Sequence, residues 1–421
     1  MLRRFPHSCI LSLLLVTIAP PASQAEYAVH DGDTVVFLGD SITAARTYGK
    51  IIENYTLLRF PERKVTFINA GRGGDTAAGG LKRLDEDVFS RGASVLIVAY
   101  GINDIGWGTK ADDEHRQLYL NSIAGIVKAC KMRGVRVFIC SAAITAEDPD
   151  RASGGFLEQM CDAGMALARE QGESSIDVQR SMRAAQRRVL EANAQTVQEK
   201  DKVSLHATDG VHLNELGQLA MAFAILKGLG APAVVSAVNI DANQLAVTSA
   251  EGCKITNLKG NGQQLEFDRL DDGLPLNLGL FVVLQFRFVP VHEELNHYML
   301  TVTGLPPGTR YEVLADGRSL GTFPVDQLRN SVNISHATGN GWVPGGPWDA
   351  QAWALAKLTD ARSELAAALF STKEFEPQRP DLANIIAQTD DANAHLVRLQ
   401  RSLVQPRPFH FIVRPAAEPK P

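Results

Sequence analysis

Four short runs of almost uninterrupted apolar residues dominate the first third of the chain, and each ends at a small or polar residue. They cover residues 34–38, 64–68, 94–99 and 135–140. A strand with one exposed face alternates apolar and polar residues, whereas a strand buried on both faces does not, and strands of the second kind are typical of parallel sheets covered by helices. Helical periodicity is found at 48–59, 117–132 and 215–229. The pattern predicts a doubly wound α/β layer structure.

The sequence pattern changes at residue 231, from alternating strands and helices to short strands alone, which suggests a second domain. Residues 233–335 contain short strand-like runs separated by turn signals, and one of the expected strands covers 281–288. Asp316-Gly317 is typical of a two-residue hairpin turn. We therefore expect a small β module over residues 231–336.

The last part of the chain carries two long helical patterns. Amphipathic stretches at 348–370 and 381–403 are expected to pack as a hairpin, and a short strand is expected at 409–413. Residues 337–421 are accordingly assigned to a C-terminal helical hairpin and tail.

The N-terminal 25 residues have the features of a secretory signal peptide. Arg3 and Arg4 precede an apolar run of eleven residues at 9–19, and Ser23-Gln24-Ala25 offers small residues for cleavage. A membrane-spanning helix needs about 20 apolar residues, so a cleaved signal is favoured over an anchor. We expect residues 1–25 to be removed, residues 26–230 to form the first domain, and the mature chain to be secreted or periplasmic.

Composition excludes several functional classes. The formal net charge is −5 and no long basic run occurs, which argues against nucleic-acid binding. No stretch after the signal is long and apolar enough to suggest membrane insertion. The absence of a CxxC pair argues against zinc ribbons and thioredoxin-like chemistry. Cys130, Cys140, Cys161 and Cys253 could form two disulfides or remain free thiols, and the sequence leaves both this choice and the oligomeric state open.

Four short polar motifs lie near the ends of predicted strands or helices, where α/β enzymes usually place their sites. They are GDSIT at 39–43, NAGRGGDT at 69–76, GIND at 101–104 and DGVH at 209–212. Each motif alone is ordinary turn or capping material. Their order and placement together indicate a catalytic site.

The residues in these motifs suit acyl transfer. Ser41 is the candidate nucleophile and needs a base. His212 can serve, because an imidazole ordinarily titrates near neutrality, and Asp209, three residues earlier on one helical turn, can orient the ring. An oxyanion also needs hydrogen-bond donors. The candidates are the Ser41 backbone N–H at a helix start, the Gly74 N–H, and the Asn103 side-chain amide.

With these residues in place, the sequence resembles the SGNH/GDSL hydrolase family over about residues 33–230. Ser41, Gly74, Asn103 and His212 match the four namesake residues in order, and Asp209 lies in the DxxH pattern. Gly71 and Gly73 compete with Gly74, which is preferred because the family's donor glycine opens a Gly-Asp-Thr-like turn. The resemblance implies a flavodoxin-like three-layer α/β/α fold and serine esterase activity that needs no cofactor or metal.

The expected function is a secreted serine esterase acting on short acyl groups, first of all acetyl, carried by a small-molecule or polysaccharide substrate. The GDSIT form of the first motif resembles carbohydrate-esterase and lysophospholipase-like branches. A lipid or aryl esterase with the same machinery is the main alternative. A non-catalytic carbohydrate-binding protein is a weaker one, because no member of the triad is missing.

Two further patterns carry competing interpretations. His206, Asp209 and His212 have spacing that would allow a metal site, but no second ligand cluster supports it. Trp107, close behind the third motif, suits either a substrate pocket or packing. For the remaining tryptophans, core packing of the hairpin is favoured over a sugar-binding platform; these are Trp342, Trp348 and Trp353.

Overall fold

The computed structural model describes residues 26–417, so the expected signal peptide lies outside the described residues. Within this range, five parallel strands form a sheet in the order β2-β1-β3-β4-β5. Their bounds are β1 Thr34–Gly39, β2 Thr66–Gly71, β3 Val95–Ala99, β4 Arg136–Cys140 and β5 Ser174–Ile176. The first four confirm the predicted strands. The order is that of flavodoxin-like folds, which confirms the expected fold class.

Side chains of one strand alternate between two hydrophobic cores, one on each face of the sheet. In β1, Val35 and Phe37 belong to one core and Val36 and Leu38 to the other. Both faces are apolar because both are covered by helices, which is why the strand has a continuous apolar sequence. One face is covered by α2 (Thr47–Arg59), α8 (Val178–Ala194) and α9 (Glu215–Gly228), and the other by α3 (Ala77–Lys82), α5 (Asp113–Met132) and α7 (Phe156–Glu170).

Shorter helical segments connect these layers. The α-helical ones are α1 Ser41–Ala44, α4 Leu84–Asp87 and α6 Pro149–Ala152, and the 3₁₀ turns are η1 Phe89–Arg91, η2 Gly106–Gly108 and η3 Glu199–Asp201. Strand β5 is absent from the predicted strands, because its Ser-Ser-Ile sequence offers a single buried apolar residue.

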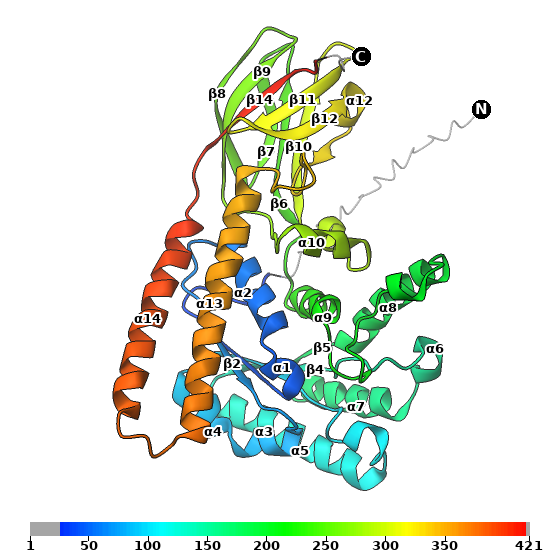
Figure 1. Cartoon of the computed structure of the whole chain (residues 1–421), viewed down its shortest axis with the longest axis vertical. Helices are drawn as coiled ribbons and strands as arrows, with labels where there is room; N and C mark the ends of the chain where they lie inside the picture. Colours follow the sequence, from blue (N-terminus) through cyan, green and yellow to red (C-terminus); the bar gives the residue numbers. More distant parts are fainter. Residues whose placement is uncertain (1–25, 418–421) are drawn as a thin grey trace, which may run out of the picture.

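The β module is built from two sheets that lie beyond one end of the α/β layers (Figure 1). One sheet has the order β13-β10-β6-β7 and the other β12-β11-β14-β9-β8. The strands are β6 Val234–Asp241, β7 Ala246–Glu251, β8 Cys253–Gly260, β9 Leu265–Asp271, β10 His297–Thr303, β11 Arg310–Ala315, β12 Arg318–Pro324, β13 Val332–Asn333 and β14 Phe409–Pro415. The predicted hairpin turn is confirmed: Ala315 pairs with Arg318, and Asp316 and Gly317 both have positive φ.

The segment 281–288 corrects the sequence-based expectation. We expect a strand there, but the structure forms α10 (Leu280–Val283) and a 3₁₀ turn, η4 (Leu284–Arg287). A short apolar run fits a buried strand or a buried helical turn equally well by periodicity alone. Here the run lies between the module and the α/β layers, with Phe286 and Phe288 in the core. Two further short helices are α11 (Val291–Glu294) and α12 (Val325–Arg329).

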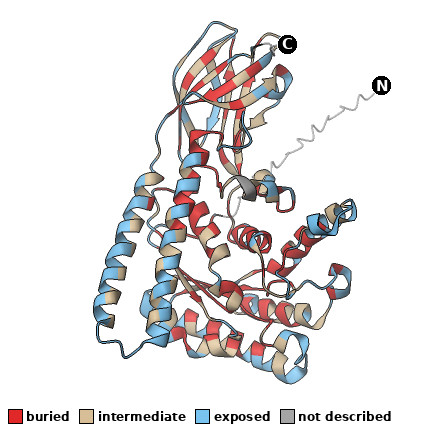
Figure 2. Ribbon diagram, viewed as in Figure 1, coloured by how far each residue is buried: buried red, intermediate tan, exposed pale blue. Residues whose placement is uncertain are grey.

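Two long helices, α13 (Pro347–Phe375) and α14 (Leu382–Leu403), form the expected hairpin beside the α/β layers (Figure 1). Figure 2 shows α14 largely exposed, whereas one side of α13 is buried against α2. Polar residues of α2 are paired there: Arg362 donates to Glu53, and the Thr359 hydroxyl lies 2.5 Å from Asn54 Oδ1. The hairpin therefore explains why α2 buries a carboxylate and an amide.

After the hairpin the chain returns to the β module, because β14 pairs with both β9 and β11. Strand β14 thus lies outside residues 231–336 in sequence and inside the module in space. Trp348, at the start of α13, is fully buried and contacts the module's Tyr298, Phe409 and Phe411 at ring-centroid distances of 4.9, 5.6 and 5.9 Å. Trp342 and Trp353 are 82% and 42% exposed, so only Trp348 is a core residue.

The structure also bears on the expectations about disulfides and about membrane-spanning segments. All four cysteines of the described part are free thiols, so the disulfide alternative is not realised. Across residues 26–417, every helix falls short of the length and apolar character that crossing a membrane requires.

Candidate active site

Three residues predicted for catalysis form a hydrogen-bonded chain. The Ser41 Oγ lies 2.9 Å from His212 Nε2, and His212 Nδ1 lies 2.6 Å from Asp209 Oδ2. A neutral imidazole that donates from Nδ1 to a carboxylate must accept at Nε2, which is the nitrogen that faces the Ser41 hydroxyl. This is the geometry in which a serine can lose its proton to a histidine.

Ser41 begins helix α1 directly after β1. The N-cap is Asp40, whose carboxylate accepts the Ile42 N–H at 2.9 Å. The backbone N–H of Ser41 falls in the first turn of α1, where amides have no acceptor within the helix. The cap thus holds the serine at the carboxyl edge of the sheet, as expected for an α/β enzyme.

Asp209 and His212 lie in a turn and not on a helical turn, which corrects the local geometry expected from their spacing. Asp209 Oδ1 accepts the N–H groups of Val211 and His212, both at 2.9 Å, and Gly210 has a φ of 71°. Helix α9 starts only after its N-cap, Asn214. The closeness of the two side chains therefore comes from an Asx-type turn.

The Asp209 carboxylate is strongly held in its ionised form. The hydrogen bond from the His212 side chain, together with those from the Val211 and His212 backbone, lowers the pKa of Asp209 to about 2. A charged carboxylate at this place orients the imidazole and stabilises it when it becomes protonated.

Two of the three predicted oxyanion donors, Gly74 and the Asn103 side chain, lie at the turn that follows β2. Gly74 has a φ of 71°, a conformation that other residues seldom adopt. The Asn103 side chain donates one N–H from Nδ2 to the carbonyl of the neighbouring Asp75 at 3.0 Å. The amide nitrogen carries a second hydrogen as well.

The competing glycines of the second motif differ in their surroundings. A Cβ on Gly71 would lie 2.2 Å from the backbone nitrogen of Ala44, so Gly71 is required for close packing against α1. A Cβ on Gly73 or Gly74 would meet open space. Of these two, only Gly74 has a left-handed backbone, the conformation that favours glycine.

A buried arginine that no sequence motif indicates connects the first two motifs and the residue that precedes the third. Arg83 donates to the Asp75 carboxylate at 2.8 Å, to the Gly39 carbonyl at 3.2 Å and to the Tyr100 hydroxyl at 2.8 Å. It also pairs with Asp87 at 2.7 Å. An arginine at the end of a short helix is ordinarily exposed, so no local pattern signals this role.

Two other motif carboxyls are buried next to the site. Burial raises the pKa of Asp40 to about 6 and that of Asp104 to about 7. Asp40 caps α1, and Asp104 Oδ1 accepts the Ala77 N–H at 3.0 Å. Both carboxyls thus accept backbone N–H groups of turns beside the strand ends.

The position of His206 does not support a metal site formed by His206, Asp209 and His212. His206 is buried, and its Nε2 lies 3.0 Å from the Ile144 carbonyl. Asp209 forms a hydrogen bond with His212, and His212 forms one with Ser41. Among residues 26–417 there is no group of three or more His, Cys, Asp or Glu side chains that could hold a metal ion.

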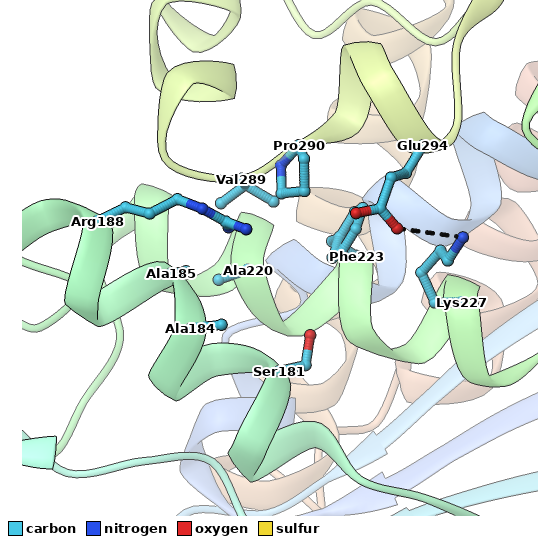
Figure 3. A pocket seen from close by; sticks show the side chains of 10 residues that line it. All are labelled: Ser181, Ala184, Ala185, Arg188, Ala220, Phe223, Lys227, Val289, Pro290 and Glu294. Atoms are coloured by element: carbon cyan, nitrogen blue, oxygen red, sulfur yellow. Dashed lines mark ion pairs between the residues drawn. The ribbon is translucent and has the colours of Figure 1, made fainter. Parts of the chain in front are cut away.

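A cavity of about 270 Å³ lies elsewhere, between helices α8 and α9 and the segment leading into α11 (Figure 3). Its charged groups are Arg188, Lys227 and Glu294, and the last two form an ion pair at 3.3 Å. None of the residues predicted for catalysis lines it.

Comparison with known proteins agrees with the architecture described above. Residues 37–220 match the GDSL-like lipase/acylhydrolase family. A solved structure of BT4096, described as a gut microbial diltiazem-metabolizing enzyme, is 24% identical, with a TM-score of 0.77 over 92% of this chain and 98% of that one. An acetylxylan esterase from Geobacillus stearothermophilus is 19% identical, with a TM-score of 0.39 over 48% of this chain and 96% of that one. No curated protein matches the chain.

Proposed function

Because residues 37–220 form a domain of the GDSL-like lipase/acylhydrolase family, we propose that this protein is a secreted serine esterase that removes short acyl groups, first of all acetyl, from carbohydrate. The observation that carries the mechanism is the chain of hydrogen bonds from Asp209 through His212 to Ser41, at 2.6 and 2.9 Å.

In the proposed reaction, Ser41 Oγ attacks the ester carbonyl carbon while its proton passes to His212 Nε2. The carbonyl oxygen becomes an oxyanion that accepts from the N–H groups of Ser41, Gly74 and Asn103. His212 then gives its proton to the leaving alcohol, and the C–O bond of the ester breaks. Water, deprotonated by the same imidazole, hydrolyses the acyl-serine and restores the free hydroxyl.

The test is acetate release from a panel of acetylated polysaccharides by the purified mature chain, with nitrophenyl esters of increasing chain length in parallel. Diltiazem belongs in the panel because the enzyme of similar architecture is described as metabolizing it. Release from polysaccharide with a preference for acetyl supports the proposal. A preference for long acyl chains would instead support the lipid esterase, and turnover of aryl esters alone would support the aryl esterase.

Secretion and metal independence are tested on the same protein. N-terminal sequencing of the exported chain is expected to read from Glu26. Activity is expected to survive EDTA, and loss in EDTA with recovery on adding Zn²⁺ would contradict the serine mechanism.

A further inference from the structure

Trp107 adopts an unusual backbone conformation in the loop that follows β3. Its φ and ψ are 57° and 31°, in the left-handed region. A bulky residue rarely adopts this conformation, and such outliers cluster at functional sites, where surrounding contacts hold them. The loop supplies those contacts, since the Trp107 N–H donates to the Ile102 carbonyl at 3.0 Å and the Gly108 N–H donates to the Ile105 carbonyl at 2.9 Å.

This conformation brings the indole to the side-chain amide of Asn103. The Trp107 Nε1–H donates to Asn103 Oδ1 at 2.8 Å. At the other end of the same amide, Nδ2 donates to the Asp75 carbonyl at 3.0 Å. Oδ1 and Nδ2 of Asn103 thus each form a hydrogen bond within the protein, and Nδ2 has a second hydrogen that these two bonds do not use.

We infer that Trp107 is a positioning residue for the esterase reaction: its indole N–H holds Asn103 so that the free amide hydrogen points toward the developing oxyanion. If the amide turned over, Oδ1 would face the oxyanion and repel it. The indole opposes that turn, because an N–H donor can pair with Oδ1 but not with Nδ2. This inference rests on the proposed function, in which Asn103 is an oxyanion donor.

The position of Trp107 also allows two different roles, which the experiment must separate from positioning. Its ring lies edge-on to the His212 ring, with centroids 5.8 Å apart, so it could act through the histidine. It is also 51% exposed, so it could bind the leaving group directly. Replacing Trp107 with Phe keeps an aromatic ring and the same backbone preferences, and removes only the N–H donor and part of the ring area.

The test is a double-mutant cycle that combines Trp107→Phe and Asn103→Ala, with kcat, KM and the pH profile measured on a nitrophenyl acetate substrate. Alone, Trp107→Phe is expected to lower kcat about tenfold, less than the ~10²–10³ for complete loss of a donor, with little change in KM. In the Asn103→Ala background the same change is expected to have no further effect, because residues that act through one another are not additive. Trp353→Phe, a tryptophan of similar exposure on α13, is the matched control and is expected to behave as the unchanged protein.

Four outcomes would overturn the inference: an unchanged kcat in Trp107→Phe, an equal loss in both backgrounds, a change in KM alone, or a shifted pH midpoint. The third would make Trp107 a leaving-group contact, and the fourth would place its effect on His212. Ser41→Ala keeps the two proposals apart. If that variant remains active, the serine mechanism itself fails, whereas an inactive Ser41→Ala beside an unaffected Trp107→Phe rejects only the role of Trp107.

A second measurement does not depend on the folding of the Trp107 variant. The chain has four tryptophans, so the indole N–H of Trp107 can be followed by nuclear magnetic resonance. Its hydrogen exchange is expected to be slow in the unchanged protein and fast in Asn103→Ala. Fast exchange in the unchanged protein would contradict the hydrogen bond to Asn103.

Discussion

The side chains of Ser41 and His212 meet at 2.9 Å although 171 residues separate them in the sequence. Serine comes from the first turn after β1 and histidine from the turn before α9, so the contact exists only in the folded domain. The first prediction follows from this contact.

Ser41→Ala is expected to abolish ester hydrolysis while the fold persists. Removal of the nucleophile of a serine triad costs about 10⁶ in kcat in a protease precedent. Steady-state kinetics on nitrophenyl acetate, with circular dichroism to verify folding, measures both effects. Ser153→Ala, the same change at an exposed loop position, is the control. Hydrolysis by Ser41→Ala at the rate of the unchanged protein would disprove the mechanism.

Asn103→Ala is expected to lower kcat by ~10²–10³, the usual cost of losing one oxyanion donor, and to change KM little. The reason is that the amide pairs better with the developing oxyanion than with the ground-state carbonyl. A rise in KM without a fall in kcat would identify Asn103 as a substrate-binding residue. Separate determination of kcat and KM decides between the two.

Gly74→Ala and Gly73→Ala form a matched pair, because a methyl group at either position meets open space. Only Gly74 has a positive φ, and alanine in the left-handed region costs roughly 1–2 kcal/mol. We expect Gly74→Ala to shift the turn and to reduce kcat by about tenfold or more, and Gly73→Ala to remain close to the unchanged protein. Equal kcat values for the two variants would remove Gly74 from the oxyanion site.

The pH profile of kcat/KM is expected to rise with pH as an imidazole base loses its proton. The pKa of Asp209 is lowered to about 2 by its hydrogen bonds from His212 and Val211, so this carboxylate stays charged throughout the working range and adds no second step. Asp209→Asn is expected to reduce kcat by up to ~10⁴, as the ring loses its preferred tautomer. A profile without any rise near neutrality would argue against a histidine base.

The free energy of unfolding is expected to depend on pH through the buried carboxyl of Asp104. Burial raises its pKa to about 7, while an unfolded aspartate titrates near 3.9. The folded state then binds more protons than the unfolded state between these values, so the contribution of Asp104 to the free energy of unfolding falls as pH rises from about 4 to about 7.

Asp104→Asn removes this titration and retains an oxygen for the Ala77 N–H. The free energy of unfolding, measured by urea titration at several pH values, is therefore expected to depend less on pH in the variant, by up to a few kcal/mol at about 1.36 kcal/mol per pKa unit. An identical pH dependence in the two proteins would show that the carboxyl ionises freely.

Much of the fold can be predicted because its information is local. The apolar runs at β1, β3 and β4 are buried on both faces, and such burial leaves a continuous pattern in the sequence. Strand β5 cannot be predicted in this way, since Ser-Ser-Ile carries no such pattern. The prediction of a strand at 281–288 is wrong because a short apolar stretch fits either a strand or a helix, and packing decides for the helix.

The sequence by itself determined the residue types of the site, since a serine, a histidine, a carboxylate and an amide in four ordered turns suit one chemistry. Only the tertiary structure decided how these residues are held. The bond from Arg83 to the Gly39 carbonyl and the insertion of β14 between β9 and β11 join positions whose spacing has no meaning along the chain. Hydrogen bonds and core packing depend on distance in space, and that distance is set only when the layers, the module and the hairpin have come together.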